Sequence, residues 1–151
     1  MPRQSRIDAP GALHHIMVRG IERRKIFVDE QDYRTFLNSL AHALIETQTP
    51  CYAWALLPNH LHLLLETGKQ RVGRVMQSIL TSYALIFNRR HKRSGHLFQN
   101  RFKSILCERE SYLRELIRYI HLNPLRAGQV HQLAALGRYP WSGHAVLMGN
   151  Q

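Results

Sequence analysis

The sequence predicts an α+β protein with a ferredoxin-like sandwich: an antiparallel sheet of four or five strands, with helices on one face. One observation is the order of its segments. Strand-like apolar runs and segments with apolar residues at helical spacing follow one another as β-α-β-β-α-β, and a further helix comes after them. A second observation is that Pro58 and Asn59 alone separate two of the strand-like runs, which is short enough for an antiparallel hairpin.

Local signals set the expected boundaries. Gly20 closes the first strand, and Asp29 is expected to cap the first helix, with acidic residues in the first turn, where the helix dipole favours them. Gly95 is a stop signal after the second helix, and Pro124 marks the end of the third, because its ring disfavours a helical residue before it. The expected strands cover about residues 11–19, 51–57, 60–66 and 104–107, and the expected helices cover about residues 30–46, 72–90 and 110–123.

The chain has 151 residues, which we expect to form a single domain 1–151, with a tail from about residue 127 packing on it. No segment approaches the ~20 apolar residues that span a bilayer, and no signal-peptide segment follows the basic N-terminus. Cys51 and Cys107 lie far apart and match no metal or redox pattern. The sequence therefore favours free thiols, a cytoplasmic location and no membrane partner.

Positive charge is the most informative bulk property. Lys and Arg number 21 against 10 acidic residues, a formal net charge of +11, which favours a polyanionic partner. A membrane-surface helix would concentrate its charge on one face, whereas these basic clusters are interleaved with aromatic and polar residues. Nucleic acid is therefore the favoured partner, and a merely well-solvated basic surface is the less favoured reading. Phe98 and Phe102 could stack on unpaired bases or pack in the core. The candidate phosphate contacts are Arg23, Arg24, Lys25, Arg89, Arg90, Lys92, Arg93, Arg101 and Lys103.

Two histidines open the strand at residues 60–66. Side chains alternate along a strand with a period of two, so His60 and His62 point to one face. Leu61, Leu63 and Leu65 then point to the other face, against a core. Two imidazoles on one strand face suit a metal ion, provided that further ligands come from elsewhere. They are equally consistent with a polar sheet face, because this motif is short.

The third helix offers the other half of such a site. Tyr119 and Asn123 lie four residues apart, so they fall on neighbouring turns of one helix face. A phenol hydroxyl and a carboxamide oxygen are thus presented together. A hard cation would accept the amide oxygen, although imidazole suits Mg²⁺ or Mn²⁺ only poorly to moderately. Taken alone, Tyr119 reads as a half-buried helix tyrosine.

Three separated motifs together resemble those of the single-tyrosine HUH transposases. They are Leu-Pro-Asn-His-Leu-His at residues 57–62, Gly-His-Leu-Phe-Gln-Asn-Arg-Phe-Lys at 95–103, and Arg-Tyr-Ile-His-Leu-Asn-Pro at 118–124. Within that group the chain most resembles the REP-associated tyrosine transposases, relatives of the smallest insertion-sequence transposases. The resemblance covers about residues 10–145, nearly the whole chain.

This resemblance implies a metal-dependent single-stranded DNA endonuclease and strand transferase that acts on hairpin DNA through a 5′-phosphotyrosine intermediate. It implies that His60, His62 and Asn123 hold a divalent cation, Mg²⁺ or Mn²⁺, and that Tyr119 attacks the scissile phosphate. A homodimer is one option, because relatives include swapped dimers as well as monomers.

Other readings remain open at this point. The main alternative is a domain that binds structured nucleic acid without catalysis. A zinc hydrolase would need another His, Asp or Glu ligand, because Asn123 is a weak zinc ligand. If Tyr119 is not the nucleophile, Tyr112 and Tyr83 are the next candidates.

Overall fold

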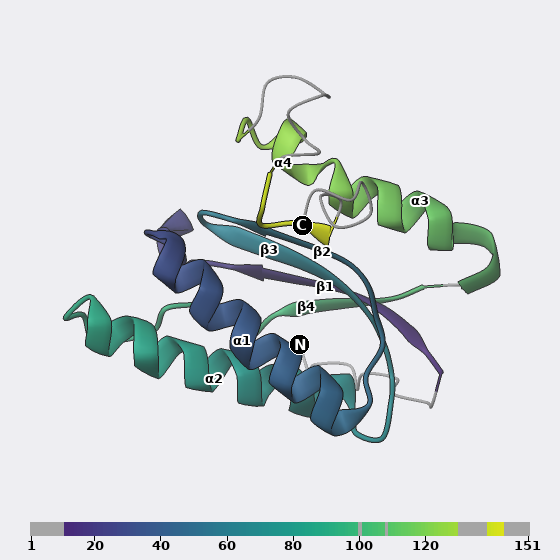
Figure 1. Cartoon of the computed structure of the whole chain (residues 1–151), viewed down its shortest axis with the longest axis horizontal. Coiled ribbons are helices and arrows are strands. Elements are labelled where there is room, and N and C mark those ends of the chain that lie inside the picture. Colours follow the sequence, from purple (N-terminus) through teal and green to yellow (C-terminus); the bar gives the residue numbers. More distant parts are fainter. Residues whose placement is uncertain (1–10, 100, 108, 130–138, 144–151) are drawn as a thin grey trace, which may run out of the picture.

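The computed structural model describes residues 11–99, 101–107, 109–129 and 139–143, and it has a four-stranded antiparallel sheet between two layers of helices (Figure 1). The elements follow one another as predicted, with bounds close to the expected ones. They are β1 (Leu13–Arg19), the short 3₁₀ helix η1 (Ile21–Arg23), α1 (Glu30–Thr47), β2 (Cys51–Leu57), β3 (His60–Glu66), α2 (Val72–Arg90), β4 (Lys103–Cys107), α3 (Arg109–His121) and α4 (Asn123–Arg126).

The strands are ordered β2-β3-β1-β4, and every pairing between them is antiparallel. The β2–β3 hairpin turns at Pro58 and Asn59, as predicted, and β1 lies between β3 and β4. The ferredoxin-like α+β fold with an antiparallel sheet is therefore confirmed, with four strands in the part of the chain that the structure describes.

Helices α1 and α2 cover one face of the sheet (Figure 1). The larger hydrophobic core lies between them and the sheet, and Leu61, Leu63 and Leu65 of β3 are fully buried in it. Phe102 is buried in the same core and Phe98 packs against it. The sequence left open whether these two aromatic residues stack on bases or pack in the core, and in the structure both contribute to the core.

Helix α3 covers the opposite face, which corrects the expectation that the helices lie on one face. A second cluster forms there from Ile120 of α3 and from residues of β1, β2 and β3, including Ala53 and Ala55. These alanines are short, so the helix can approach β2 closely. The cluster also holds Leu13, Leu57 and Leu64 of the strands, and burying them requires a second helical layer.

The end of α3 also differs from the expected one. Helix α3 stops at His121 instead of Asn123, and α4 begins directly afterwards with Pro124 in its first turn. Proline is tolerated there because the first backbone N–H groups of a helix have no partner within the helix. Pro124 therefore belongs to the start of a new helical turn, and Asn123, which is buried, begins that turn.

An ion-pair cluster joins the start of α1 to the end of α2. Asp29 caps α1 as predicted, accepting a hydrogen bond from the backbone N–H of Asp32 at 3.1 Å. Arg90 donates to carboxylate oxygens of both Asp29 and Asp32 at 2.6 Å, and the Nε2 of His91 lies 2.8 Å from Asp32. The hydrogen bond from Arg90 lowers the pKa of Asp29 to about 2. A charged bridge thus fastens the two helices together.

Part of the expected tail lies within the described residues. The Tyr139 hydroxyl donates to the Leu56 carbonyl at 2.7 Å, and the Leu56 N–H donates to the Trp141 carbonyl at 2.7 Å. The Trp141 ring stacks on Tyr33 of α1 with centroids 4.7 Å apart. Residues 130–138 and 144–151 of that tail lie outside the described part of the chain.

We expect Asp32→Asn to lower the free energy of unfolding by about 2 kcal/mol, because the buried carboxylate accepts hydrogen bonds from Arg90 and from the Val28 backbone. Urea denaturation measures this change. Glu30→Gln is the matched control. It removes an exposed carboxylate that pairs with Arg34 on the same helix, and such pairs contribute less than about 0.5 kcal/mol. Equal effects of the two substitutions would contradict a structural role for the cluster.

Candidate functional site

Polar residues gather at one end of the sheet, on the face that α3 covers. Strand pairing places His60 opposite Arg19, and it places His62 opposite Met17, which also pairs with Lys103 of β4. Residues paired directly across antiparallel strands point to the same face. Both histidines and both cationic residues therefore share one face and one end of the sheet.

The rings of His60 and His62 lie side by side on this face, as the alternation of β3 predicted, with centroids 5.3 Å apart. The Nδ1 of His60 lies 2.7 Å from the Asn59 amide oxygen, and its Nε2 lies 3.3 Å from the Asn123 amide oxygen. A neutral imidazole has a single N–H, so only one nitrogen of His60 can donate to its neighbouring amide oxygen. The other nitrogen carries a lone pair that faces the oxygen beside it. A cation would satisfy that lone pair and that oxygen together.

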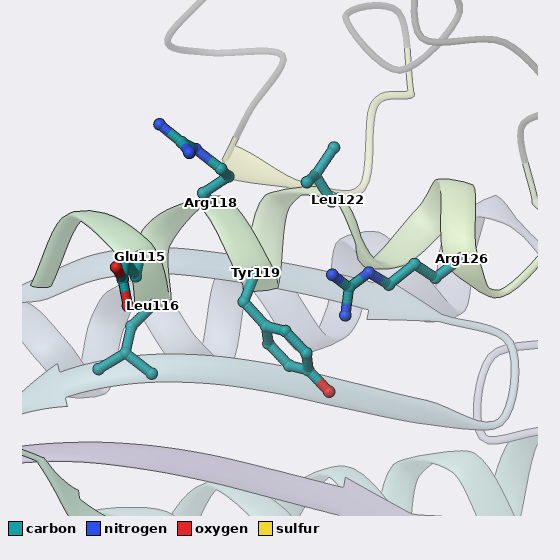
Figure 2. A pocket seen from close by; sticks show the side chains of 6 residues that line it. All are labelled: Glu115, Leu116, Arg118, Tyr119, Leu122 and Arg126. Carbon is teal, nitrogen blue, oxygen red and sulfur yellow. The ribbon is translucent and has the colours of Figure 1, made fainter. Parts of the chain in front are cut away.

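Tyr119 of α3 faces the same group of residues. Its ring centroid lies 6.1 Å from that of His62, and the two rings are nearly perpendicular. Figure 2 shows the phenol side chain directed from the helix toward the strands. Tyr119 is 39% exposed, so its ring is open to a large ligand. The structure thus brings Tyr119, His60, His62 and Asn123 together from two strand positions and two helices.

One neighbour of these residues was not among the predicted site residues. His15 of β1 is buried, and its Nε2 lies 3.1 Å from the Nδ1 of His62. Its ring also meets Tyr119 edge to face, with centroids 5.9 Å apart. His15 was missed because its contact with His62 depends on the register between β1 and β3. The side-by-side pair His14-His15 was the only signal of it in the sequence.

Burial keeps the three imidazoles neutral. It lowers the pKa of His62 to about 3, and it also lowers the pKa values of His60 and His15. A neutral imidazole offers a lone pair and does not repel a cation. The carboxamide of Asn123 interacts with both His60 and His62, so the donor atoms converge.

The donors at this site are two imidazoles and a carboxamide. Among the described residues, no three His, Cys, Asp or Glu side chains are grouped to hold a metal ion. Zinc sites favour nitrogen and sulfur donors from three or four side chains. The mixed set found here fits a more weakly held cation that keeps positions open for oxygen atoms of a ligand.

Arg126 contacts the candidate nucleophile and was also missed. Its guanidinium carbon lies 4.7 Å from the centroid of the Tyr119 ring, a cation–π contact. The two residues help to line a cavity of about 410 Å³, together with Glu115, Leu116, Arg118 and Leu122 (Figure 2). Arg126 lies beyond Pro124, where the sequence predicted that the helix had ended. Its nearness to Tyr119 depends on α4.

The other tyrosine candidates fare differently. The Tyr83 hydroxyl is buried and donates a hydrogen bond to the Ile26 carbonyl, and burial raises its pKa. It therefore cannot reach a ligand or lose its proton readily. The Tyr112 side chain lies outside the described part of the structure.

Most of the candidate phosphate contacts are exposed. The loop after α2 lies against the end of β1, where the Ile21 N–H donates to the Leu97 carbonyl at 2.9 Å. This contact brings the basic segment 23–25 and the basic segment 89–93 to the same end of the sheet as His60. The exposed candidates are Arg23, Arg24, Lys25, Arg89, Lys92, Arg101 and Lys103.

Three candidates already have protein partners. Arg24 forms an exposed ion pair with Glu22 at 3.6 Å, and the other two, Arg90 and Arg93, lie at the end of α2 and in the loop after it. Arg90 forms the ion pairs with Asp29 and Asp32. Arg93 donates to the Asn88 side chain at 3.0 Å and to the His96 carbonyl at 3.2 Å. Both therefore hold the end of α2 and its loop in place, whatever else they contact. None of the described helices is long and apolar enough to cross a membrane.

Comparison with solved structures supports the fold. The chain is similar to a REP-associated tyrosine transposase solved bound to a REP hairpin, with a TM-score of 0.79 and 20% sequence identity, over 100% of this chain and 88% of that one. It is also similar to a protein of Deinococcus radiodurans R1 described as a candidate transposase, with a TM-score of 0.53 and 16% identity, over 81% of this chain and 97% of that one. No curated protein sequence matches the chain significantly.

The family model described as "Transposase IS200 like" matches residues 10–123. That match includes all four residues that converge at the end of the sheet. The chain therefore belongs to the family of IS200-like transposases, which act on DNA.

Proposed function

We propose that this transposase cleaves and rejoins single-stranded hairpin DNA at the site formed by Tyr119, His60, His62 and Asn123. The observation that carries the proposal is their convergence. A partly exposed phenol lies beside two neutral imidazoles, one of which meets an amide oxygen at 3.3 Å. A structurally similar transposase was solved bound to a REP hairpin, which supports hairpin DNA as the substrate of this protein.

In the proposed reaction, the Tyr119 oxygen attacks the phosphorus of a phosphodiester. The bond from phosphorus to the 3′ oxygen breaks and a 5′-phosphotyrosine forms. The Tyr119 hydroxyl gives up its proton to solvent, and the 3′ oxygen takes up one proton and leaves as a hydroxyl, so the step is balanced. The phosphodiester bond energy is retained in the protein–DNA link, so a 3′-hydroxyl can reverse the step and join strands. The reaction therefore needs no nucleotide cofactor.

His60, His62 and Asn123 would hold a divalent cation, Mg²⁺ or Mn²⁺. Such a cation supplies positive charge to a phosphate oxygen. The chain contributes further positive charge through Arg126, which lies over the Tyr119 ring, and through Arg19, which pairs with His60. Tyr119 approaches from the helix side while the imidazoles approach from the strand side, so a phosphate between them would be held from both directions.

The exposed basic residues would bind the DNA backbone. Several of them lie at the end of the sheet that holds His60, and Lys103 lies in the same row of side chains as His62. A cytoplasmic location fits a partner of this kind. A homodimer stays a prediction.

Tyr119→Phe should abolish cleavage and covalent linkage, because it removes only the attacking oxygen. Affinity for the hairpin should change little. The measurement is a nicking assay on labelled hairpin DNA with Mg²⁺ or Mn²⁺, with the covalent adduct resolved on a denaturing gel. Tyr52→Phe is the matched control, since the Tyr52 hydroxyl bonds to Glu66 on the strands. If the native protein binds hairpins but never cuts them, the chain is a binding protein without catalysis.

His60→Ala and His62→Ala should each reduce the cleavage rate at least about a hundredfold. Loss of a residue that only supports a metal ligand costs up to about a hundredfold, and loss of the ligand itself should cost at least as much. Added Mn²⁺ should rescue them poorly, because the ligand itself is missing. Single-turnover cleavage at several Mn²⁺ concentrations measures this. His42→Ala, an exposed change on α1 next to Glu46, should leave the rate unchanged. Full activity of both site variants would rule out the proposed cation site.

Lys103→Ala should make binding of single-stranded DNA less sensitive to salt. Each phosphate contact adds about 0.7 to the slope of log affinity against log salt concentration, so the slope should fall by about that amount. Fluorescence anisotropy between low and high salt measures it. Arg34→Ala removes an exposed cation on α1 that is paired with Glu30, and it should leave the slope as it is. If the salt dependence falls more for Arg34→Ala than for Lys103→Ala, the DNA binds on the face of the sheet that α1 covers and not on the face of the candidate site.

A further inference from the structure

We propose that His15 is a positioning residue, which holds the His62 ring so that its Nε2 faces the cation site. This inference rests on the proposed function, because it assigns His15 a task in the same site. His15 itself is not proposed to bind the cation or the DNA.

The two rings meet through defined atoms. The Nε2 of His15 lies 3.1 Å from the Nδ1 of His62, within hydrogen-bond distance, and the ring centroids are 5.3 Å apart with a tilt of 34°. His15 is only 6% exposed, so water does not compete well for this bond. The contact consumes one of the two nitrogens of His62.

Strand register places the rings at this distance. His15 pairs with Leu64 across the β1–β3 ladder, and His62 pairs with Met17. His15 and His62 are therefore diagonal neighbours on the same face, and diagonal side chains are within reach when they are long or aromatic. A one-residue slip of β1 would move His15 to the other face of the sheet.

The bond fits the form of His62 that a cation requires. If Nε2 of His62 is to bind a cation, that atom must carry the lone pair, so the ring proton must be on Nδ1. His15 is then the acceptor of that N–H. His60 is held in the same manner, because its Nδ1 lies 2.7 Å from the Asn59 amide oxygen. Metal-binding histidines usually donate their second N–H to such a partner, which orients the ring.

His15 also contacts the proposed nucleophile. Its ring meets Tyr119 edge to face, at a centroid distance of 5.9 Å and an angle of 74°. It thus lies against both the imidazole and the phenol that must meet at the same phosphate. A buried histidine that served the core alone would not need a polar contact directed at a site residue.

The neighbouring residue on β1 provides a matched comparison. His14 is equally buried but points to the opposite face, where its ring nitrogens lie 3.2 Å from the hydroxyls of Ser104 and Thr67. Removing either histidine deletes a buried imidazole from the same strand. Only His15 should affect the cation.

The experiment measures Mn²⁺ binding by calorimetry and by electron paramagnetic resonance of the full chain without DNA. We expect His15→Leu to weaken Mn²⁺ binding by about 10- to 100-fold, the range for losing an outer partner of a metal ligand. His15→Gln should bind nearly as well as the native protein, because its amide can reach the position of Nε2. His14→Leu should leave the Mn²⁺ affinity unchanged.

His15→Asn keeps the test decisive if His15→Leu does not fold. Asparagine is polar like glutamine but too short to reach His62, so it should show the loss that glutamine avoids. Circular dichroism checks that each variant is folded. Equal Mn²⁺ affinity in the native protein, His15→Asn and His15→Leu, or an equal loss in His14→Leu, would overturn the inference.

Failure of the proposed function gives a different result. If His60→Ala and His62→Ala bind Mn²⁺ as well as the native protein, or the native protein binds none, the cation site itself is wrong. If those two variants lose Mn²⁺ while His15→Leu retains it, the cation site stands and only the role of His15 is rejected.

Discussion

The two-residue alternation of β3 is the constraint on which the rest of the structure depends. Leu61, Leu63 and Leu65 are fully buried in the core under α1 and α2, and this burial holds the strand in one register. A shift by one residue would turn all three leucines away from this core. The same pleat that buries them turns His60 and His62 to the other face, so the stability of the core and the geometry of the site have one cause.

The second helical layer makes that other face a place for chemistry. Without α3, the histidines would lie on a solvated sheet face. With α3 packed on Ala53 and Ala55, they lie in a partly dehydrated space, and burial lowers their pKa values. Because the chain carries a net charge of +11, neutral imidazoles also avoid adding to the positive charge already at this end of the sheet.

The basic residues serve more than one purpose. Sequence clustering treated the run at residues 89–93 as one set of phosphate contacts, yet Arg90 bridges two aspartates and Arg93 closes its own loop. A guanidinium bound to carboxylates presents little free charge. Arg126 and Arg19 were absent from that set, although one lies on the Tyr119 ring and the other beside His60. Net charge therefore indicates a class of partner, whereas the fold sets which cations are already paired within the protein.

Local pattern was enough to predict most of the elements and the strand half of the candidate site. The Asp29 cap, the Pro58–Asn59 hairpin and the shared face of His60 and His62 depend on residues near one another in the chain, and they were predicted. Bringing Tyr119 and Asn123 to those histidines was expected from a family resemblance, since periodicity along a helix says nothing about which strand it meets. Tertiary structure alone decided the second helical layer, the start of α4 at Asn123 and the places of His15 and Arg126 beside the site. Strand register, packing between layers and the direction of the chain after a helix ends join residues that are distant in sequence, and no local preference encodes those contacts.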